Sequence, residues 1–282
     1  MIILRRIIDF LLYSNLWIAV CAAALVMETD LLFAPQLSFH PLVWTVFFST
    51  LFLYAVHRII GVHISKGFIS GRYLVIQKHE WHILFYAMVS ALGLAYFFLQ
   101  LPTHLQVEIL IAALPSLGYV FPVLGNKKRI RDIHLVKIFL VAITWTFITI
   151  FLPIFEPGVH LRQSIIPLML ERFFFIFAIT LPFDIRDLAL DEFTKVKTIP
   201  SWLGIKKTKK IAYLLTFLAM FTAFISFQTG LYSLPNFLAA ITVYFLTIIV
   251  IRQTTPERHD YFFTGLTDGL MFIHFLLFYL FG

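Results

Sequence analysis

Long apolar runs separated by short polar segments make up this 282-residue chain. Each run is close to the roughly 20 residues that an α-helix needs to cross about 30 Å of hydrocarbon. The first run exceeds the usual signal-peptide core of about 7–15 residues, so we expect it to be retained as a helix. The pattern therefore predicts nine membrane-spanning helices, at residues 7–27, 41–56, 81–101, 107–124, 135–155, 165–183, 211–229, 236–251 and 264–281.

Composition supports an all-α polytopic membrane protein. Hydrophobic residues make up 60% of the chain and charged residues 13%, and the mean hydropathy is +0.90. A soluble domain is about 45–50% apolar and 25% charged. The sole cysteine, Cys21, excludes a disulfide framework and a cysteine-based zinc site.

The basic residues fall almost entirely on one side of the predicted bundle. Nineteen Lys and Arg lie at the N-terminus and in alternate connecting segments, whereas the other segments contain only Arg162. Positive charge marks cytoplasmic loops, so we expect a cytoplasmic N-terminus and an outer C-terminus, in the plasma membrane if the source is bacterial. This bias and anionic lipid account for the net charge of +7 without a nucleic-acid partner.

The two longest connecting segments lie four predicted helices apart along the chain. This spacing is typical of an internal repeat, although apolar helices resemble one another in any case. It predicts one transmembrane domain over 1–282, with quasi-equivalent halves at about 1–124 and 135–251 and a ninth helix at 264–281.

Three carboxylates follow the sixth run with helical spacing. Asp184, Asp187 and Asp191 would project at about 0°, 300° and 340° around a helix, because each residue turns it by roughly 100°. Clustered like charges repel, and Mg²⁺ is commonly held by one or two carboxylates together with substrate phosphates. The motif therefore indicates a magnesium site, and the alternative is a solvated acidic helix end.

The acidic motif and the nine runs resemble the UbiA superfamily of intramembrane prenyltransferases. The sequence Asp184-x-x-Asp187-x-x-x-Asp191 is followed by Lys197-Thr198-Ile199-Pro200, which is similar to the second aspartate-rich motif of that family. The resemblance implies transfer of an isoprenyl chain from its diphosphate to a lipophilic, often aromatic, acceptor. It also implies Mg²⁺ bridging the aspartates and the diphosphate at the cytoplasmic mouth of the bundle.

The resemblance also assigns site residues. It implies that Asp184, Asp187 and Asp191 are metal ligands. Lys195 stands where the family usually has glycine and adds a charge beside them, and with Arg58 it is a candidate catalytic residue. The candidate substrate-binding residues are Asn15, Tyr54, Tyr119, Lys127, Lys128 and Arg129.

The family's first motif, Asn-x-x-x-Asp-x-x-x-Asp, is missing. The segment from Tyr54 to His63 offers no carboxylate, and Arg58 lies about 40° around the helix from Tyr54. Because arginine chelates phosphate oxygens, Arg58 could replace part of the role of a metal. It could equally pair with the aspartates and silence them.

Other ionisable residues lie inside the runs. Asp268, in the ninth run, is a candidate for a cavity function or for pairing with a nearby cation. For Glu171 and Arg172, in the sixth run, we expect local pairing or snorkelling towards the interface.

The motifs and the membrane pattern are compatible with three functions. The first is Mg²⁺-dependent transfer from a prenyl diphosphate to a lipophilic acceptor within the membrane. The second is a non-catalytic relative that binds a lipid diphosphate or a partner. The third is a secondary transporter, which the position of the acids at one membrane face disfavours.

Overall fold

The computed structural model describes residues 2–33, 36–64, 80–121, 130, 133, 135–155 and 165–282, and within them the regular structure is entirely helical. The α-helices are α1 Ile2–Tyr13, α2 Leu16–Phe33, α3 Pro41–Ile64, α5 Glu80–Phe98, α6 Thr103–Val120, α7 Val136–Thr146, α8 Ile166–Arg186, α9 Leu188–Phe193, α10 Ile199–Leu203, α11 Ile205–Gln228, α12 Leu234–Gln253 and α13 Asp268–Phe281. Two π-helical segments, η3 Phe147–Phe151 and η5 Phe262–Thr267, and one 3₁₀ segment, η4 Pro153–Phe155, adjoin them.

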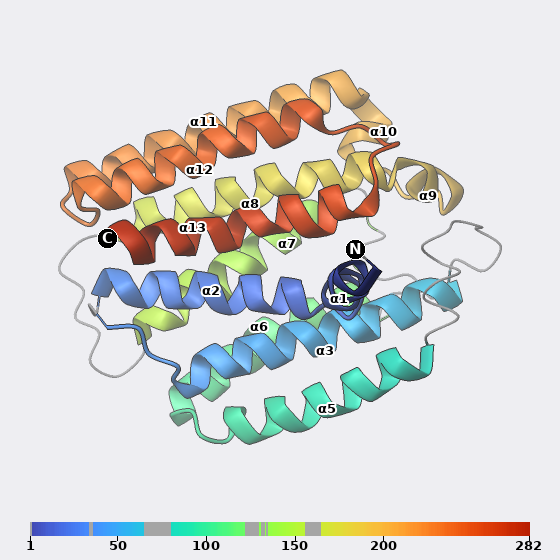
Figure 1. The fold of residues 1–282 in the computed structure, drawn as a ribbon, viewed down its shortest axis with the longest axis horizontal. Coiled ribbons are helices and arrows are strands. Elements are labelled where there is room, and N and C mark those ends of the chain that lie inside the picture. Colours follow the sequence, from blue (N-terminus) through green and yellow to red (C-terminus); the bar gives the residue numbers. More distant parts are fainter. Residues whose placement is uncertain are drawn as a thin grey trace.

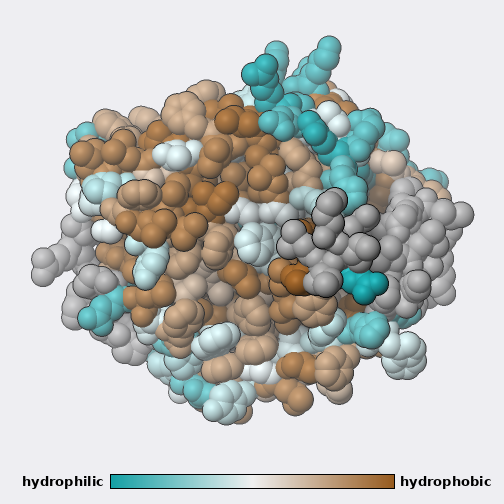
Figure 2. Space-filling model, in the orientation of Figure 1, coloured by the Kyte–Doolittle hydropathy of each residue, from teal (hydrophilic) through white to brown (hydrophobic). Residues whose placement is uncertain are grey.

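The long helices run side by side in one bundle, and α1 lies across them (Figure 1). Helices α9 and α10 lie at one end of the bundle, and the C-terminus lies at the other. Figure 2 shows apolar side chains along the helices and hydrophilic ones gathered where α10 and α11 begin. This distribution is that of a multi-pass membrane protein, with lipid-facing walls and a polar end.

Eight helical segments among the described residues are long and apolar enough to cross a membrane. The predicted run 107–124 forms most of α6, but this helix carries His104, Gln106 and Glu108 in its first turns and is not one of the eight. The total of nine spans, the orientation of the termini and the two quasi-equivalent halves stay predictions.

The predicted first helix, 7–27, is wrong in its bounds. It is divided between α1 and α2 at Asn15, whose φ of 66° is left-handed. Asparagine adopts this conformation more readily than most residues. The membrane span is instead Leu16–Phe33, and it continues through Glu28 and Asp30, which the pattern had assigned to a loop.

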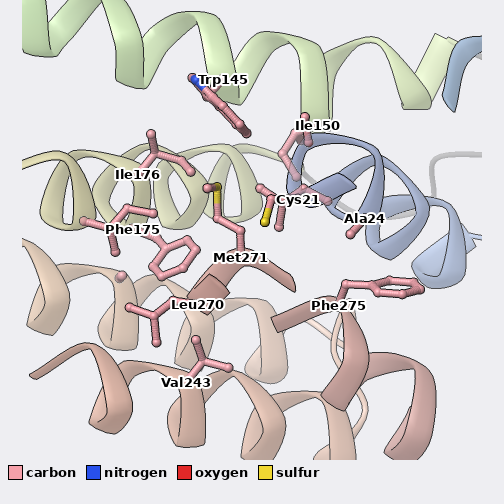
Figure 3. Packing of buried hydrophobic residues seen from close by; sticks show 14 of the residues in the cluster. Cys21, Ala24, Trp145, Ile150, Phe175, Ile176, Val243, Leu270, Met271 and Phe275 are labelled. Atoms are coloured by element: carbon pink, nitrogen blue, oxygen red, sulfur yellow. The ribbon is translucent and has the colours of Figure 1, made fainter. Parts of the chain in front are cut away.

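In the core, α8 packs against α7 and α11, α2 packs against α13, and α12 packs against α11 and α13. Helix α2 presents small residues, Cys21 to Ala24, which let neighbouring backbones approach closely in a membrane protein. Figure 3 shows Cys21, Ile150 and Met271 converging from α2, η3 and α13.

Side chains of α2 hydrogen-bond to both π-helical segments. The Thr29 hydroxyl donates to the Thr149 carbonyl in η3 at 2.6 Å, and the Trp17 indole donates to the Gly265 carbonyl in η5 at 3.1 Å. Backbone polar groups within a bilayer need partners inside the protein. These bonds therefore stabilise the irregular segments and attach them to α2.

The expectation of local pairing or snorkelling for Glu171 and Arg172 is wrong. Both are buried, and Arg172 forms an ion pair with Glu28 of α2 at 2.5 Å. His274 of α13 contacts the other Glu28 oxygen at 2.7 Å, and the Tyr244 hydroxyl of α12 donates to Glu171. Because α8 is central, its polar residues face other helices. These five residues are called the buried polar network below.

Candidate functional site

A cavity of about 210 Å³ lies where α8 passes into α9. Figure 1 shows this junction at one end of the bundle. Helices α2, α3, α6, α7, α8, α9 and α13 contribute to its wall. Most of the predicted site residues lie here although they are far apart in the sequence. Those that line the cavity are Asn15, Tyr54, Arg58, Tyr119, Asp184, Asp187 and Asp191, together with Asp268.

Two of the three predicted acids share one face. Helix α8 ends at Arg186, and the helical path resumes at Leu188, with the Asp191 amide donating to the Asp187 carbonyl at 2.9 Å. Asp184 and Asp191 are therefore about two helical turns apart, on the side that faces the cavity, and both are buried.

Lys137 of α7 lies between these two carboxylates. Its ammonium is 2.6 Å from Asp184 Oδ1 and 3.7 Å from Asp191 Oδ2, and the side chain is buried. The sequence motifs did not point to this residue. The available signal was a lysine inside the apolar run 135–155, since an ionisable residue in a membrane span is a functional candidate by default.

The third acid, Asp187, pairs with its neighbour Arg186. The guanidinium donates two hydrogen bonds to this carboxylate, at 2.8 and 3.1 Å, and a third at 2.9 Å to Asp260. It also lies over the rings of Phe183 and Phe263. The planar guanidinium suits such two-pronged pairing and aromatic stacking. Arg186 lines the cavity and was also absent from the predicted site residues.

Arg58 reaches the cavity from α3, and its guanidinium donates to the carbonyl of Tyr13 at the C-terminal end of α1. The last carbonyls of a helix have no partner within the helix and carry partial negative charge. Nearby, the side-chain amide nitrogen of Asn15 is buried without a hydrogen-bond partner among the described residues. The sequence left open whether Arg58 pairs with the aspartates. Among the ion pairs of the described residues, Asp184 pairs with Lys137 and Asp187 pairs with Arg186.

A second cavity of about 150 Å³ shares a wall with the first. Both cavities are lined by Tyr54, His57, Tyr119, Val141 and Trp145. The second cavity as a whole exposes mostly apolar surface, and the rest of its lining, from α3, α6, α7 and η3, is uncharged: Thr50, Leu53, Ser116, Leu140, Thr144 and Ile148. A polar compartment therefore adjoins an apolar one across an aromatic wall.

Lys195 is exposed and does not line the cavity, although its neighbours Thr194 and Val196 do. Its φ of 57° places it at the turn after α9. The described geometry gives it no contact with the site, so its catalytic role stays a prediction. The predicted substrate-binding residues Lys127, Lys128 and Arg129 lie outside the described residues.

Mg²⁺ would have to compete with the fixed cations of the cavity. Among the described residues no group of three His, Cys, Asp or Glu side chains could hold a metal ion. Two unit charges about 4 Å apart interact by about 4 kcal/mol at an effective dielectric constant of about 20, so repulsion by Lys137 of roughly 8 kcal/mol would cancel the attraction of a divalent ion to one of the two carboxylates. Because the Lys137 ammonium already lies 2.6 Å from Asp184 and 3.7 Å from Asp191, these two acids do not fit a bridging metal ion in this arrangement.

The fold and the cavity define a multi-pass helical membrane protein with a charged site at one end of the bundle. No family model and no curated protein matches the sequence. Several solved structures share the fold across nearly the whole chain, among them the following three.

The first is a UbiA homolog from Archaeoglobus fulgidus bound to GPP and Mg²⁺, at 12% identity and a TM-score of 0.66, covering 96% of this chain and 99% of that chain. The second is a digeranylgeranylglyceryl phosphate synthase, at 14% identity and a TM-score of 0.62, covering 97% of each chain. The third is an apo UbiA homolog from Aeropyrum pernix K1, at 11% identity and a TM-score of 0.65, covering 96% of each chain. This chain therefore has the fold of the UbiA homologues, as the acidic motif had predicted.

Proposed function

We propose that the protein binds a prenyl diphosphate in the charged cavity and transfers its isoprenyl chain to a lipophilic acceptor within the membrane. The observation that carries this proposal is the pairing of the charged cavity with an apolar one in a UbiA fold. The homologue complexes with GPP and with DMAPP support a prenyl diphosphate as the ligand class.

Cationic side chains would recognise the diphosphate. Arg58, Lys137 and Arg186 all line the charged cavity. Guanidinium groups bind phosphate oxygens through two parallel hydrogen bonds, and an ammonium adds a compact charge. The buried Asn15 amide, which has no partner among the described residues, supplies a further donor.

The apolar cavity would receive the isoprenyl chain. Its shared wall brings Tyr54, Tyr119 and Trp145 to the boundary between the two compartments. The reacting allylic carbon would then lie near aromatic faces, which stabilise positive charge. A dry compartment would also protect a carbocation from water.

In the proposed reaction the bond between the allylic carbon and the diphosphate oxygen breaks, and both electrons leave with the diphosphate. The allylic carbon then forms a bond to a nucleophilic atom of the acceptor, which loses a proton. Arg58, Lys137 and Arg186 would stabilise the charge that grows on the leaving group. The predicted Mg²⁺ dependence is not part of the proposal, because Lys137 pairs with Asp184 and Asp191.

A non-catalytic binder of prenyl diphosphates is the second candidate. It is favoured by the sequence from Tyr54 to His63, which lacks the carboxylates of the family's first motif. Such a protein would bind the ligand in the same cavity and leave it intact.

The two candidates differ in one measurement. The purified protein in lipid nanodiscs is incubated with labelled geranyl diphosphate, with and without membrane extract as the source of acceptor, and diphosphate release and ligand binding are measured. We expect binding and release that depends on the extract, both weakened in Arg58→Ala and unchanged in the exposed control Lys206→Met. Binding without release would select the non-catalytic candidate, and the absence of both would refute the proposed function.

A further inference from the structure

We infer that Lys137 is a tethered cation that takes the place of a divalent metal ion between Asp184 and Asp191. These two acids then bind no metal of their own. The inference concerns the site of the proposed function and rests on that function only for the identity of the ligand.

The contact geometry carries this inference. The Lys137 ammonium lies 2.6 Å from one carboxylate oxygen and 3.7 Å from the other, on the face that the two acids share. Side-chain exposure is 9% for Lys137, 2% for Asp184 and 4% for Asp191, so water screens this contact poorly. A metal ion that bridged the two carboxylates would have to occupy the space of the ammonium.

The positive charge between these acids comes from a protein side chain and not from a bound ion. Lys137 belongs to α7, which packs along α8, so its charge is delivered by the fold and needs no binding equilibrium. Arg186 forms ion pairs with Asp187 and Asp260, so its charge is likewise supplied by the fold. Each cation therefore offsets one of the two negative charges that it contacts before a ligand arrives, and a phosphate group would meet cations that are already positioned.

Manganese binding in the absence of any prenyl ligand tests the inference. The metal-stripped protein in nanodiscs is titrated with Mn²⁺, and the free ion is followed by electron paramagnetic resonance. We expect no stoichiometric Mn²⁺ binding at these acids in the wild type, so Asp184→Asn should leave the titration unchanged. In Lys137→Met the two carboxylates lose their cation, and one Mn²⁺ should then bind, with an affinity at least tenfold above the wild type.

The double variant Lys137→Met/Asp184→Asn keeps the charge balance and should lose this new site. Lys206→Met, which removes an exposed lysine, is the matched control and should titrate as the wild type does. Two results would overturn the inference: Mn²⁺ binding in the wild type that Asp184→Asn abolishes, or no gain of binding in folded Lys137→Met. If Lys137→Met does not fold, the wild-type and Asp184→Asn titrations decide alone.

Geranyl diphosphate binding is measured in the same preparations with EDTA and with Mg²⁺. The wild type should keep its affinity in EDTA, whereas Lys137→Met should bind weakly in EDTA and regain affinity with Mg²⁺. A wild type that binds only with Mg²⁺ would contradict the inference and leave the proposed function standing. Absence of geranyl diphosphate binding in every condition would refute the proposed function, and the Mn²⁺ titrations would still decide on Lys137.

Discussion

Replacing Arg172 by methionine tests the buried polar network. This change removes the cation that contacts Glu28 at 2.5 Å and leaves that carboxylate, which is 0% exposed, inside the bundle. Breaking a buried ion pair by removing one partner costs about 3–5 kcal/mol, because the other charge stays desolvated. This cost corresponds to about two to four decades in the ratio of folded to unfolded protein.

His274 contacts the same carboxylate at 2.7 Å and reduces the cost without removing it. The double variant Glu28→Gln/Arg172→Met carries neither charge, and a glutamine oxygen can still accept a hydrogen bond from His274. We therefore expect the double variant to recover most of the lost stability, to within about 2 kcal/mol of the wild type. With Glu28→Gln measured alone as well, the double-mutant cycle gives the coupling energy between Glu28 and Arg172.

Equilibrium unfolding by steric trapping in bicelles measures these free energies, and the thermal midpoint gives a second reading. Arg252→Met, an exposed change at the end of α12, is the control and should stay within about 0.5 kcal/mol of the wild type. A cost below about 1 kcal/mol for Arg172→Met would refute the reasoning, because that value is typical of an ion pair that water screens.

Three further predictions concern packing, topology and the cavity. Gly93→Ala should destabilise the protein by about 1–3 kcal/mol in the same unfolding assay, because a Cβ there would lie 2.7 Å from the Phe48 ring. In intact cells, Lys207→Cys should be protected from a membrane-impermeant thiol reagent whereas Ser233→Cys should react, since the basic segments are predicted to be cytoplasmic. Arg58→Ala should weaken geranyl diphosphate binding about tenfold or more by calorimetry, and Arg58→Lys should recover only part, because an ammonium lacks the two-pronged geometry.

Each of these changes has its own check. For Gly61→Ala the added Cβ meets no atom of another described segment within 4 Å, so the stability of this variant should not fall. An equal loss in both variants would contradict the packing argument. Labelling of Lys207→Cys from outside would contradict the predicted orientation. Full geranyl diphosphate affinity in Arg58→Ala, or complete recovery of that affinity in Arg58→Lys, would contradict a role of the guanidinium in phosphate recognition.

The sequence alone predicted much of the fold and part of the site. The class of protein and the position of most spans follow from composition and run length, because a bilayer demands long apolar helices whatever their partners are. The spacing of Asp184, Asp187 and Asp191 predicted a shared face, and Asp184 and Asp191 lie together on it at the cavity. These inferences rest on local geometry, which the chain encodes over one or two helical turns.

Only the tertiary structure decided which charges meet. Glu28 pairs with Arg172, 144 residues away, and with His274, 246 residues away, while Lys137 reaches the acids from a different helix. A membrane helix is apolar towards lipid and towards protein alike, so its sequence lacks the polar face that marks the exposed side of a soluble helix. The partner of a buried charge therefore depends on how the helices pack, and in this protein packing brings a lysine to the acids where the motif predicted a metal ion.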